Sequence, residues 1–111
     1  MMSIESSFDE YKAQLSKMLH DKVDPYLALR IMYLERRLPE FPPKVELDIK
    51  ARDFNTASDL KELMRIEYGY EVARDKDHVT AVGFTNMEKL EKISALSDIE
   101  WITGSASPAP P

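Results

Sequence analysis

The residues best suited to chemistry lie near position 76, where His78 stands close to Asp75 and Asp77. Imidazole and carboxylate groups are suitable ligands for divalent metal ions. A metal site would need a further ligand from another part of the fold, and the Asp-x-Asp pattern is also common in solvated turns. Residues 20–24 hold a similar group between two expected helices. We interpret both groups as solvated turns and predict no metal site.

The chain contains none of the residue patterns that are typical of common catalytic sites. The Gly-x-Ser-x-Gly and His-Glu-x-x-His motifs are absent, and with only 3 Gly a phosphate-cradling loop is disfavoured. The lack of Cys excludes disulfides, thiolate nucleophiles and Cys-ligated metal sites. Glu62 and Glu88 are followed by Arg or Lys at helical spacing, which is typical of solvated helix faces. We therefore expect no catalytic residue, no cofactor and no enzymatic activity, with catalysis at a site that the sequence does not reveal as an alternative.

The charge of the chain disfavours nucleic-acid binding. The net charge is −5, and neither residues 1–43 nor residues 44–111 carry an excess of Lys and Arg. The polar side of the strand expected at residues 44–51 consists of Lys44, Glu46, Asp48 and Lys50. It lacks the aromatic rings on which RNA-recognition modules stack bases. A protein partner is therefore expected in place of RNA or DNA.

The location expected from the sequence is the cytoplasm. No apolar run approaches the ~18–20 residues of a membrane-spanning helix. The first ten residues lack the basic region and apolar stretch of a signal peptide. The absence of Cys also fits a reducing compartment.

The front of the chain predicts a hairpin of two helices. A Ser-x-x-Glu capping box that starts at Ser7 predicts a first helix over residues 8–21. Asp24, followed by a proline, is expected to cap a second helix. That helix runs to about Leu38, because Pro39 cannot continue it.

The second helix is apolar around most of its circumference, a pattern that normally indicates burial on several sides. It could pack on the rest of the chain, on a second copy in a homodimer, or in the groove of a partner. Tyr and Arg dominate the energetics of desolvated interfaces. We therefore predict partner contacts at Tyr26, Leu29, Arg30, Tyr33 and Arg37. Ordinary core packing and solvated charges are the alternative for these residues.

Residues 44–103 predict the order β-α-β-β-α-β. Residues 44–51 alternate between apolar and charged, as in a strand of a sheet that is covered on one face only. Strands at 70–74 and 78–84 form a hairpin, and residues 99–103 form the last strand. This order predicts a ferredoxin-like sandwich in the α+β class, with strand order 4-1-3-2 and both helices on one face.

Helix ends in this unit are predicted from capping residues. Ser58 or Thr56 should cap the first of its helices, and Gly69 should follow the end of that helix. Thr85 and Glu88 should form a capping box for the second.

The chain thus divides into three parts. Residues 1–43 are the helical hairpin and a Pro-rich connector, and residues 44–103 are the ferredoxin-like domain. The composition of residues 104–111 predicts a disordered tail.

One stretch resembles a known family. His78-Val-Thr-Ala-Val-Gly-Phe-Thr85 and Leu90-Glu-Lys-Ile-Ser-Ala-Leu-Ser-Asp-Ile-Glu-Trp-Ile102 are similar to the latter half of subtilisin propeptide-type inhibitor domains. The resemblance covers residues 78–102. It implies an inhibitor or folding chaperone whose C-terminal tail lies in a protease cleft. On that analogy the inserted segment would be Thr103, Gly104, Ser105 and Ala106.

These observations predict a small, non-enzymatic interaction or regulatory protein that associates with itself through the apolar second helix. A propeptide-like protease inhibitor that uses its C-terminal tail is the alternative.

Overall fold

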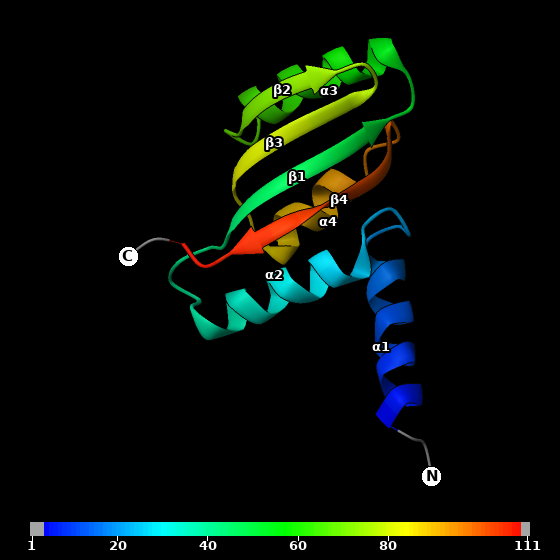
Figure 1. The fold of residues 1–111 in the computed structure, drawn as a ribbon, viewed down its shortest axis with the longest axis vertical. Helices are drawn as coiled ribbons and strands as arrows, with labels where there is room; N and C mark the ends of the chain where they lie inside the picture. The colour runs from blue at the N-terminus through cyan, green and yellow to red at the C-terminus, as the bar shows by residue number, and fades with distance from the viewer. Residues whose placement is uncertain (1–3, 110–111) are drawn as a thin grey trace.

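The computed structural model describes residues 4–109, with the side chains of residues 4–8 left aside, and places two helices before a β-α-β-β-α-β unit (Figure 1). The elements are α1 (Ile4–Met18), α2 (Pro25–Arg37), β1 (Lys44–Ala51), α3 (Phe54–Ile66), β2 (Glu71–Asp75), β3 (His78–Phe84), α4 (Met87–Ser94) and β4 (Ile99–Ser107). The strands form one antiparallel sheet in the order β2-β3-β1-β4. The predicted α+β class and the predicted strand order are confirmed.

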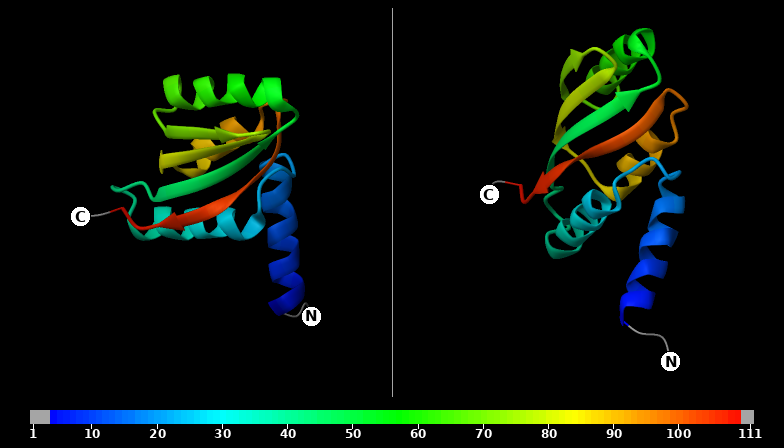
Figure 2. Two further views of the ribbon diagram at one scale, coloured as in Figure 1. Left: turned by 45° about the horizontal axis from the view of Figure 1, so that its top comes forward. Right: turned by 45° about the vertical axis from the view of Figure 1, so that its right-hand side comes forward.

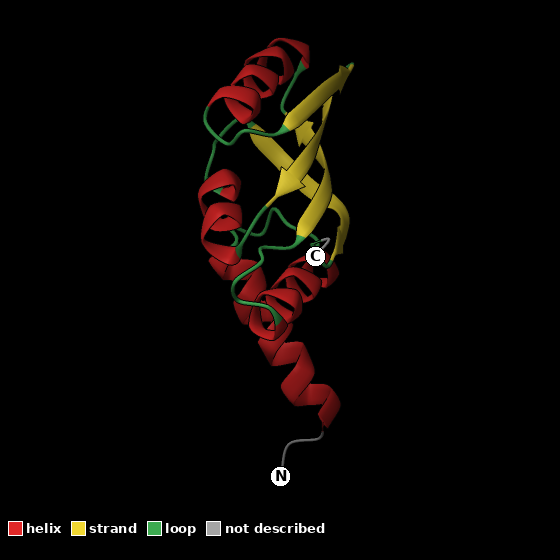
Figure 3. Cartoon of the chain, turned by 90° about the vertical axis from the view of Figure 1, so that its left-hand side faces the viewer, coloured by secondary structure: helices red, strands yellow, loops and turns green. Residues whose placement is uncertain are grey.

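The centre of the sheet is β1, in which buried and exposed residues alternate over the predicted range. Val45, Leu47 and Ile49 face the core, and the charged residues between them face solvent. Helices α3 and α4 lie on the same face of the sheet, and no described helix covers the other face (Figure 3). The apolar face of β1 thus requires the two helices as its cover.

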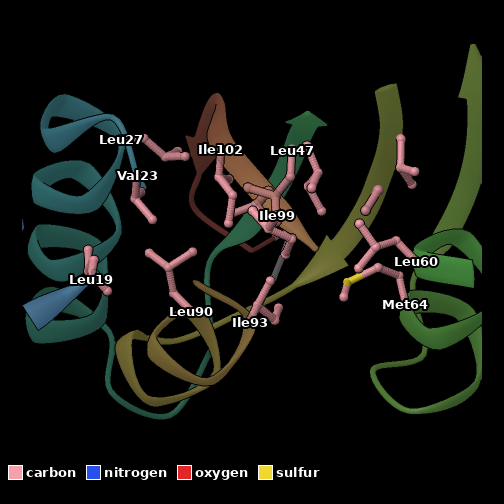
Figure 4. Packing of buried hydrophobic residues seen from close by; sticks show 14 of the residues in the cluster. Leu19, Val23, Leu27, Leu47, Leu60, Met64, Leu90, Ile93, Ile99 and Ile102 are labelled. Atoms are coloured by element: carbon pink, nitrogen blue, oxygen red, sulfur yellow. The ribbon is translucent and has the colours of Figure 1, made fainter. Parts of the chain in front are cut away.

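The core is one cluster that joins the sheet to α2, α3 and α4 (Figure 4). Leu47 of β1 shares it with Leu60 and Met64 of α3 and with Leu90 and Ile93 of α4, and all of these side chains are at most 2% exposed. Burying a side chain of this size contributes about 1.5–3 kcal/mol. The core is therefore the main source of stability for the sandwich.

Helix α2 packs within its own chain, beside β4 and α4 (Figures 1 and 2). Its buried residues are Leu27, Ala28, Ile31 and Leu34. Two polar contacts also join this part of the chain to α4 and the loop after it. The Met87 N–H donates to Glu35 Oε2 at 3.2 Å, and Lys22 Nζ donates to the Leu96 carbonyl at 2.9 Å. The sequence left open whether this helix packs on its own chain, on a second copy or on a partner. The buried side of α2 packs on its own chain.

The first helix differs from the prediction at both ends. It begins at Ile4, so Ser7 lies inside the helix and does not cap it. It ends at Met18 because His20 and Asp21 take left-handed backbone conformations, with φ of 61° and 56°. The two helices diverge from this turn, whereas the sequence predicted a helical hairpin (Figure 2).

The predicted caps of α3 and α4 are also wrong. Asp53 caps α3 by accepting from the Thr56 N–H at 2.8 Å, and Thr56 Oγ1 accepts from the Asp53 N–H. Asn86 caps α4 by accepting from the Lys89 N–H at 2.7 Å. Thr85, the predicted cap, is buried and donates its backbone N–H to the Pro43 carbonyl. Thr85 is thus held by the loop before β1, and the residue after it caps α4.

The helix α3 ends at Ile66 with Glu67 as its C-cap, so Gly69 is not the residue that directly follows the cap. Gly69 still takes a left-handed backbone conformation, with φ of 71°. The prediction that Gly69 directly follows the helix end is therefore wrong by one residue, although the left-handed conformation is the one that glycines adopt after helices.

The last strand is longer than predicted. Strand β4 continues to Ser107, because residues 104–107 pair with residues 44–47 of β1. The prediction of a disordered tail is therefore wrong for residues 104–107, and residues 110–111 lie outside the described part. Gly104 has φ of 149°, and a Cβ at this position would collide with the Glu46 carbonyl oxygen. A glycine is needed here for close approach of two strands.

None of the described helices combines the length and the apolar character needed to cross a membrane.

Candidate functional site

Four of the five predicted partner-binding residues share one exposed stripe of α2. Tyr26, Arg30, Tyr33 and Arg37 follow one another at helical spacing and are all exposed. Tyr26 is 64% and Tyr33 49% exposed. Leu29 lies outside the stripe, half-buried against the core cluster. The structure thus brings four of these residues together and assigns the fifth to packing.

The aromatic rings of this stripe are held by neighbouring cations. The Arg30 and Arg37 guanidinium carbons lie 5.9 Å and 5.8 Å from the centre of the Tyr33 ring. Arg37 Nη1 also donates to the Tyr33 hydroxyl at 3.1 Å, and Lys12 Nζ lies 5.3 Å from the Tyr26 ring. Exposed cation–π contacts contribute about 0.5–1 kcal/mol each. Such contacts favour defined positions for the rings, although the rings remain open to solvent.

A shallow groove of about 240 Å³ lies between this stripe and the outer edge of β4. Its helix side is formed by Asp24, Tyr26, Leu27 and Arg30, and its strand side by Gly104, Ser105 and Ala106. The groove therefore joins two predicted contact residues to the segment that the family resemblance singles out. We call it the α2–β4 groove.

The outer edge of β4 begins covered and then becomes open. The Ile102 N–H donates to the Lys22 carbonyl at 2.7 Å, and the Ile102 carbonyl accepts from the Asp24 N–H at 2.9 Å. These bonds form a single parallel bridge between Val23 and Ile102. Pro25 then begins α2, and the chain leaves the edge. Beyond this point no described loop or helix backbone pairs with the outer edge of β4.

Two further residues of β4 direct backbone groups to the same edge as Ile102. Alternate residues of an antiparallel strand turn their N–H and C=O groups to opposite sides. Gly104 and Ala106 therefore point into the α2–β4 groove, whereas Thr103 and Ser105 bond to β1. The contact from Arg30 Nε to the Ala106 carbonyl, at 3.4 Å, agrees with this direction. Within residues 4–109, the Gly104 N–H and C=O and the Ala106 N–H have no partner on this side.

Some arginines in the described part of the chain have a carboxylate partner there, and those of α2 do not. Arg52 pairs with Asp98 at 3.2 Å and Arg65 with Glu62 at 2.8 Å. The Arg65 guanidinium lowers the pKa of the Glu62 carboxyl by hydrogen bonding and by its charge. In contrast, the three arginines of α2 have no carboxylate partner among the described residues; they are Arg30, Arg36 and Arg37. Helix α2 thus carries three arginines, of which Arg30 lines the groove together with the acidic Asp24.

The histidine considered as a metal ligand lies elsewhere. His78 Nδ1 is 2.8 Å from Asp48 Oδ1, and His78 Nε2 is 3.6 Å from Asp77 Oδ1. Asp48 reaches this place because β1 and β3 pair with Lys50 opposite His78, which sets the two side chains on diagonal positions. Among the described residues, no three His, Asp or Glu side chains are arranged so that they could hold a metal ion together. Exposed pairs of this kind contribute little to stability.

Sequence reasoning missed the role of Gly104 and Ala106 as strand-edge residues. The signal available was the run from Thr103 to Ser107, which contains no proline until position 108 and so could continue a strand. The small residues of this run favour a disordered tail when composition alone is considered. The bonding direction of each residue depends on the register with β1, which the sequence does not reveal.

Comparison of the chain with family models, with curated proteins and with solved structures finds no match.

Proposed function

We propose that this protein is a non-enzymatic binding module that adds an extended segment of a partner protein to its sheet as a fifth strand. The segment would lie in the α2–β4 groove and pair with the outer edge of β4. The observation that carries this proposal is the set of outward-facing backbone groups without a partner among the described residues, namely the Gly104 N–H and C=O and the Ala106 N–H. We also assign the β-α-β-β-α-β unit to the ferredoxin-like folds, on its element order and strand order.

Strand addition fits the chemistry of this edge. In this mode of recognition main-chain hydrogen bonds supply affinity, and pockets for alternate side chains supply specificity. The small side chains of Gly104, Ser105 and Ala106 leave room for another backbone. The α2 side of the groove supplies an aromatic and a charged side chain, Tyr26 and Arg30, for contact with the added segment. The chain's own Val23 already uses the first position of this edge.

The opposite edge of the sheet supports the choice of β4. Free edges invite unwanted pairing, and proteins commonly protect them with charged side chains. Strand β2 carries Glu71, Arg74 and Asp75 in five residues. The open part of β4, from Thr103 to Ser107, carries no charge at all. An edge that lacks this protection fits a site that is meant to be paired.

A different protein is favoured over a second copy as the partner. Four of the apolar residues of α2 that suggested self-association are buried within the chain and are not available to a second copy; they are Leu27, Ala28, Ile31 and Leu34. The inhibitor alternative is not favoured either, because residues 103–106 pair with residues 45–48 of β1 and do not extend away from the body.

Selection followed by NMR tests this proposal. A phage-displayed library of random heptapeptides is selected against the full chain, and the strongest peptide is titrated into ¹⁵N-labelled protein. We expect the amide signals of Gly104 and Ala106 to shift and their hydrogen exchange to slow. The amides of β2, the other edge, serve as the matched control and should not change. If no peptide binds, or if the changes map to β2 or to the open sheet face, the proposal is wrong.

A further inference from the structure

We infer that the segment captured in the α2–β4 groove is acidic, with its carboxylates placed over the Arg30 and Arg37 end. This inference rests on the proposed function and adds the chemical class of the partner. Three features of the molecule support it: the charge inventory of the chain, the direction of α2 along β4 and the position of Asp24.

The arginines of α2 are clustered in the sequence and lack carboxylate partners among the described residues. The chain carries 20 acidic and 15 basic residues, so a basic side chain has many carboxylates available to it. Arg52 and Arg65 have found such partners. Arg30, Arg36 and Arg37 stand within eight residues of each other and have none among the described residues. Arginine forms bidentate, charge-assisted bonds with carboxylates, so such bonds could form with an incoming segment.

The direction of α2 places Arg30 in the groove and Arg37 beyond the residues that line it. Val23 lies beside Ile102 at one end, and Arg30 reaches the Ala106 carbonyl further on. The start of the helix therefore matches the start of the open edge, and later helix residues lie toward its far end. Arg30 and Arg37 are separated by about 10 Å along the helix axis, since each residue adds ~1.5 Å. Side chains on one face of an added strand repeat every ~7 Å. Two or three of them can therefore meet this basic stretch.

The near end of the groove has the opposite charge. Asp24 lines the groove beside Tyr26, and its carboxylate accepts from the Tyr26 N–H as the N-cap of α2. A carboxylate on the partner would be repelled here and attracted at Arg30. The groove is thus polarised, with an acidic and aromatic start and a basic end. This polarity would also fix the direction in which an acidic segment lies, because reversing the segment would bring its charged end to Asp24.

The composition of selected peptides tests this inference. The heptapeptide library is selected against the wild-type chain and against two charge-reversal variants. Arg30→Glu/Arg37→Glu alters the groove. Arg74→Glu is the matched control, because Arg74 also lacks a carboxylate partner among the described residues but lies on β2. We expect Asp and Glu to be at least twice as frequent in the pool selected by the wild type as in the starting library. The control should select the same pool, and the double variant should lose the enrichment.

Affinity gives a second measure. The strongest acidic peptide should bind the double variant about tenfold more weakly than the wild type, since reversed charges oppose both attraction and docking. It should bind the Arg74→Glu variant as it binds the wild type. Higher salt should weaken the wild-type complex in the same direction.

The two proposals fail in different ways. If selected peptides shift the Gly104 and Ala106 amides but are neutral or basic, the binding module stands and the acidic partner is wrong. If an acidic pool appears but the peptides leave these amides unchanged, the strand-addition site and this inference are both wrong. If no peptide is selected, both are also wrong.

Discussion

Val23 and Ile102 form a single parallel bridge, and it marks the place where the outer edge of β4 stops being covered. The N-terminal segment supplies one strand-like residue before Pro25 turns the chain into α2. The same segment therefore protects the start of this edge and, through α2, forms one side of the groove beside the rest. Covering part of an edge in this way limits pairing to a short stretch.

Proline substitutions separate the two sides of β4. Ala106→Pro removes a backbone N–H that faces the groove, so the sheet keeps its ladder with β1 and stability should change little. Ser105→Pro removes an N–H that bonds to β1 and should lower the unfolding free energy by about 3 kcal/mol. Thermal unfolding measures both effects, and binding of a selected peptide should be lost in Ala106→Pro. Equal destabilisation by the two variants would contradict the opposite bonding directions of Ser105 and Ala106.

Two glycines with positive φ should respond differently to alanine. At Gly104 a Cβ would collide with the Glu46 carbonyl oxygen, so Gly104→Ala should cost about 2–3 kcal/mol and loosen the end of β4. At Gly69 nothing lies within 4 Å of the added atom, and only the left-handed conformation resists the change. Gly69→Ala should therefore cost about 1 kcal/mol. Denaturant unfolding measures the loss of unfolding free energy in both variants. A larger loss in Gly69→Ala than in Gly104→Ala would contradict this prediction.

Tyr26 and Leu29 should separate binding from stability, although both are predicted contact residues. Tyr26 is 64% exposed and lines the groove, so Tyr26→Ala should weaken peptide binding and leave the melting temperature nearly unchanged. Leu29 is half-buried against the core, so Leu29→Ala should cost about 1–2 kcal/mol of stability and leave binding intact. Calorimetry and peptide titration of each variant provide the two readouts. If Tyr26→Ala lowered stability and Leu29→Ala weakened peptide binding, the binding site would not lie on the Tyr26 side of α2.

Tyr70 should make the protein sensitive to alkali. Its ring lies against Gly83, it is 3% exposed, and its hydroxyl oxygen forms no hydrogen bond of regular geometry with the described residues. Burial raises the pKa of the Tyr70 hydroxyl, an effect that the Thr85 hydroxyl offsets only in part.

The sign of this pH effect follows from the raised pKa. A folded-state pKa above the unfolded value means that the native state holds the proton more tightly. Stability from this group is complete below pH 10, the ordinary pKa of tyrosine, and declines as the pH rises toward the higher folded value. Tyr70→Phe should remove this decline and, by deleting an unsatisfied hydroxyl, should be neutral or stabilising by up to about 1 kcal/mol at pH 7. Unfolding at pH 7 and pH 10.5 tests this, and parallel losses in both proteins would contradict it.

The parts of the fold that local pattern determines could be predicted. The strict alternation from Lys44 to Ala51 predicted β1 with its correct ends, because period two with one charged face has few other interpretations. Asp24 before Pro25 likewise located the start of α2. In each case the physical cause lies within a few residues of the feature itself.

The parts that depend on distant residues could not be predicted. Residues 104–107 form a strand only because β1 pairs with them along its whole length, and their own composition is that of a linker. Asp48 meets His78 only through the register of β1 with β3. The α2–β4 groove exists only because α2 lies beside β4 and because the last strand continues past Thr103. Both conditions depend on residues that are distant in the sequence. Two residues of the groove's helix side, Tyr26 and Arg30, were therefore among the residues that the sequence singled out, and none of its strand side was predicted as part of a groove.

Amide hydrogen exchange of β4 in the free protein tests the central claim most directly. If the outer edge is open, the amides of Thr103 and Ser105 should exchange slowly because they bond to β1, and those of Gly104 and Ala106 should exchange fast. Ile102 should be slow, since it donates to the Lys22 carbonyl. Uniformly slow exchange from 102 to 107 would mean that this edge is already paired, and uniformly fast exchange would mean that the strand ends near Thr103. Either result would contradict an open β4 edge that begins after Ile102.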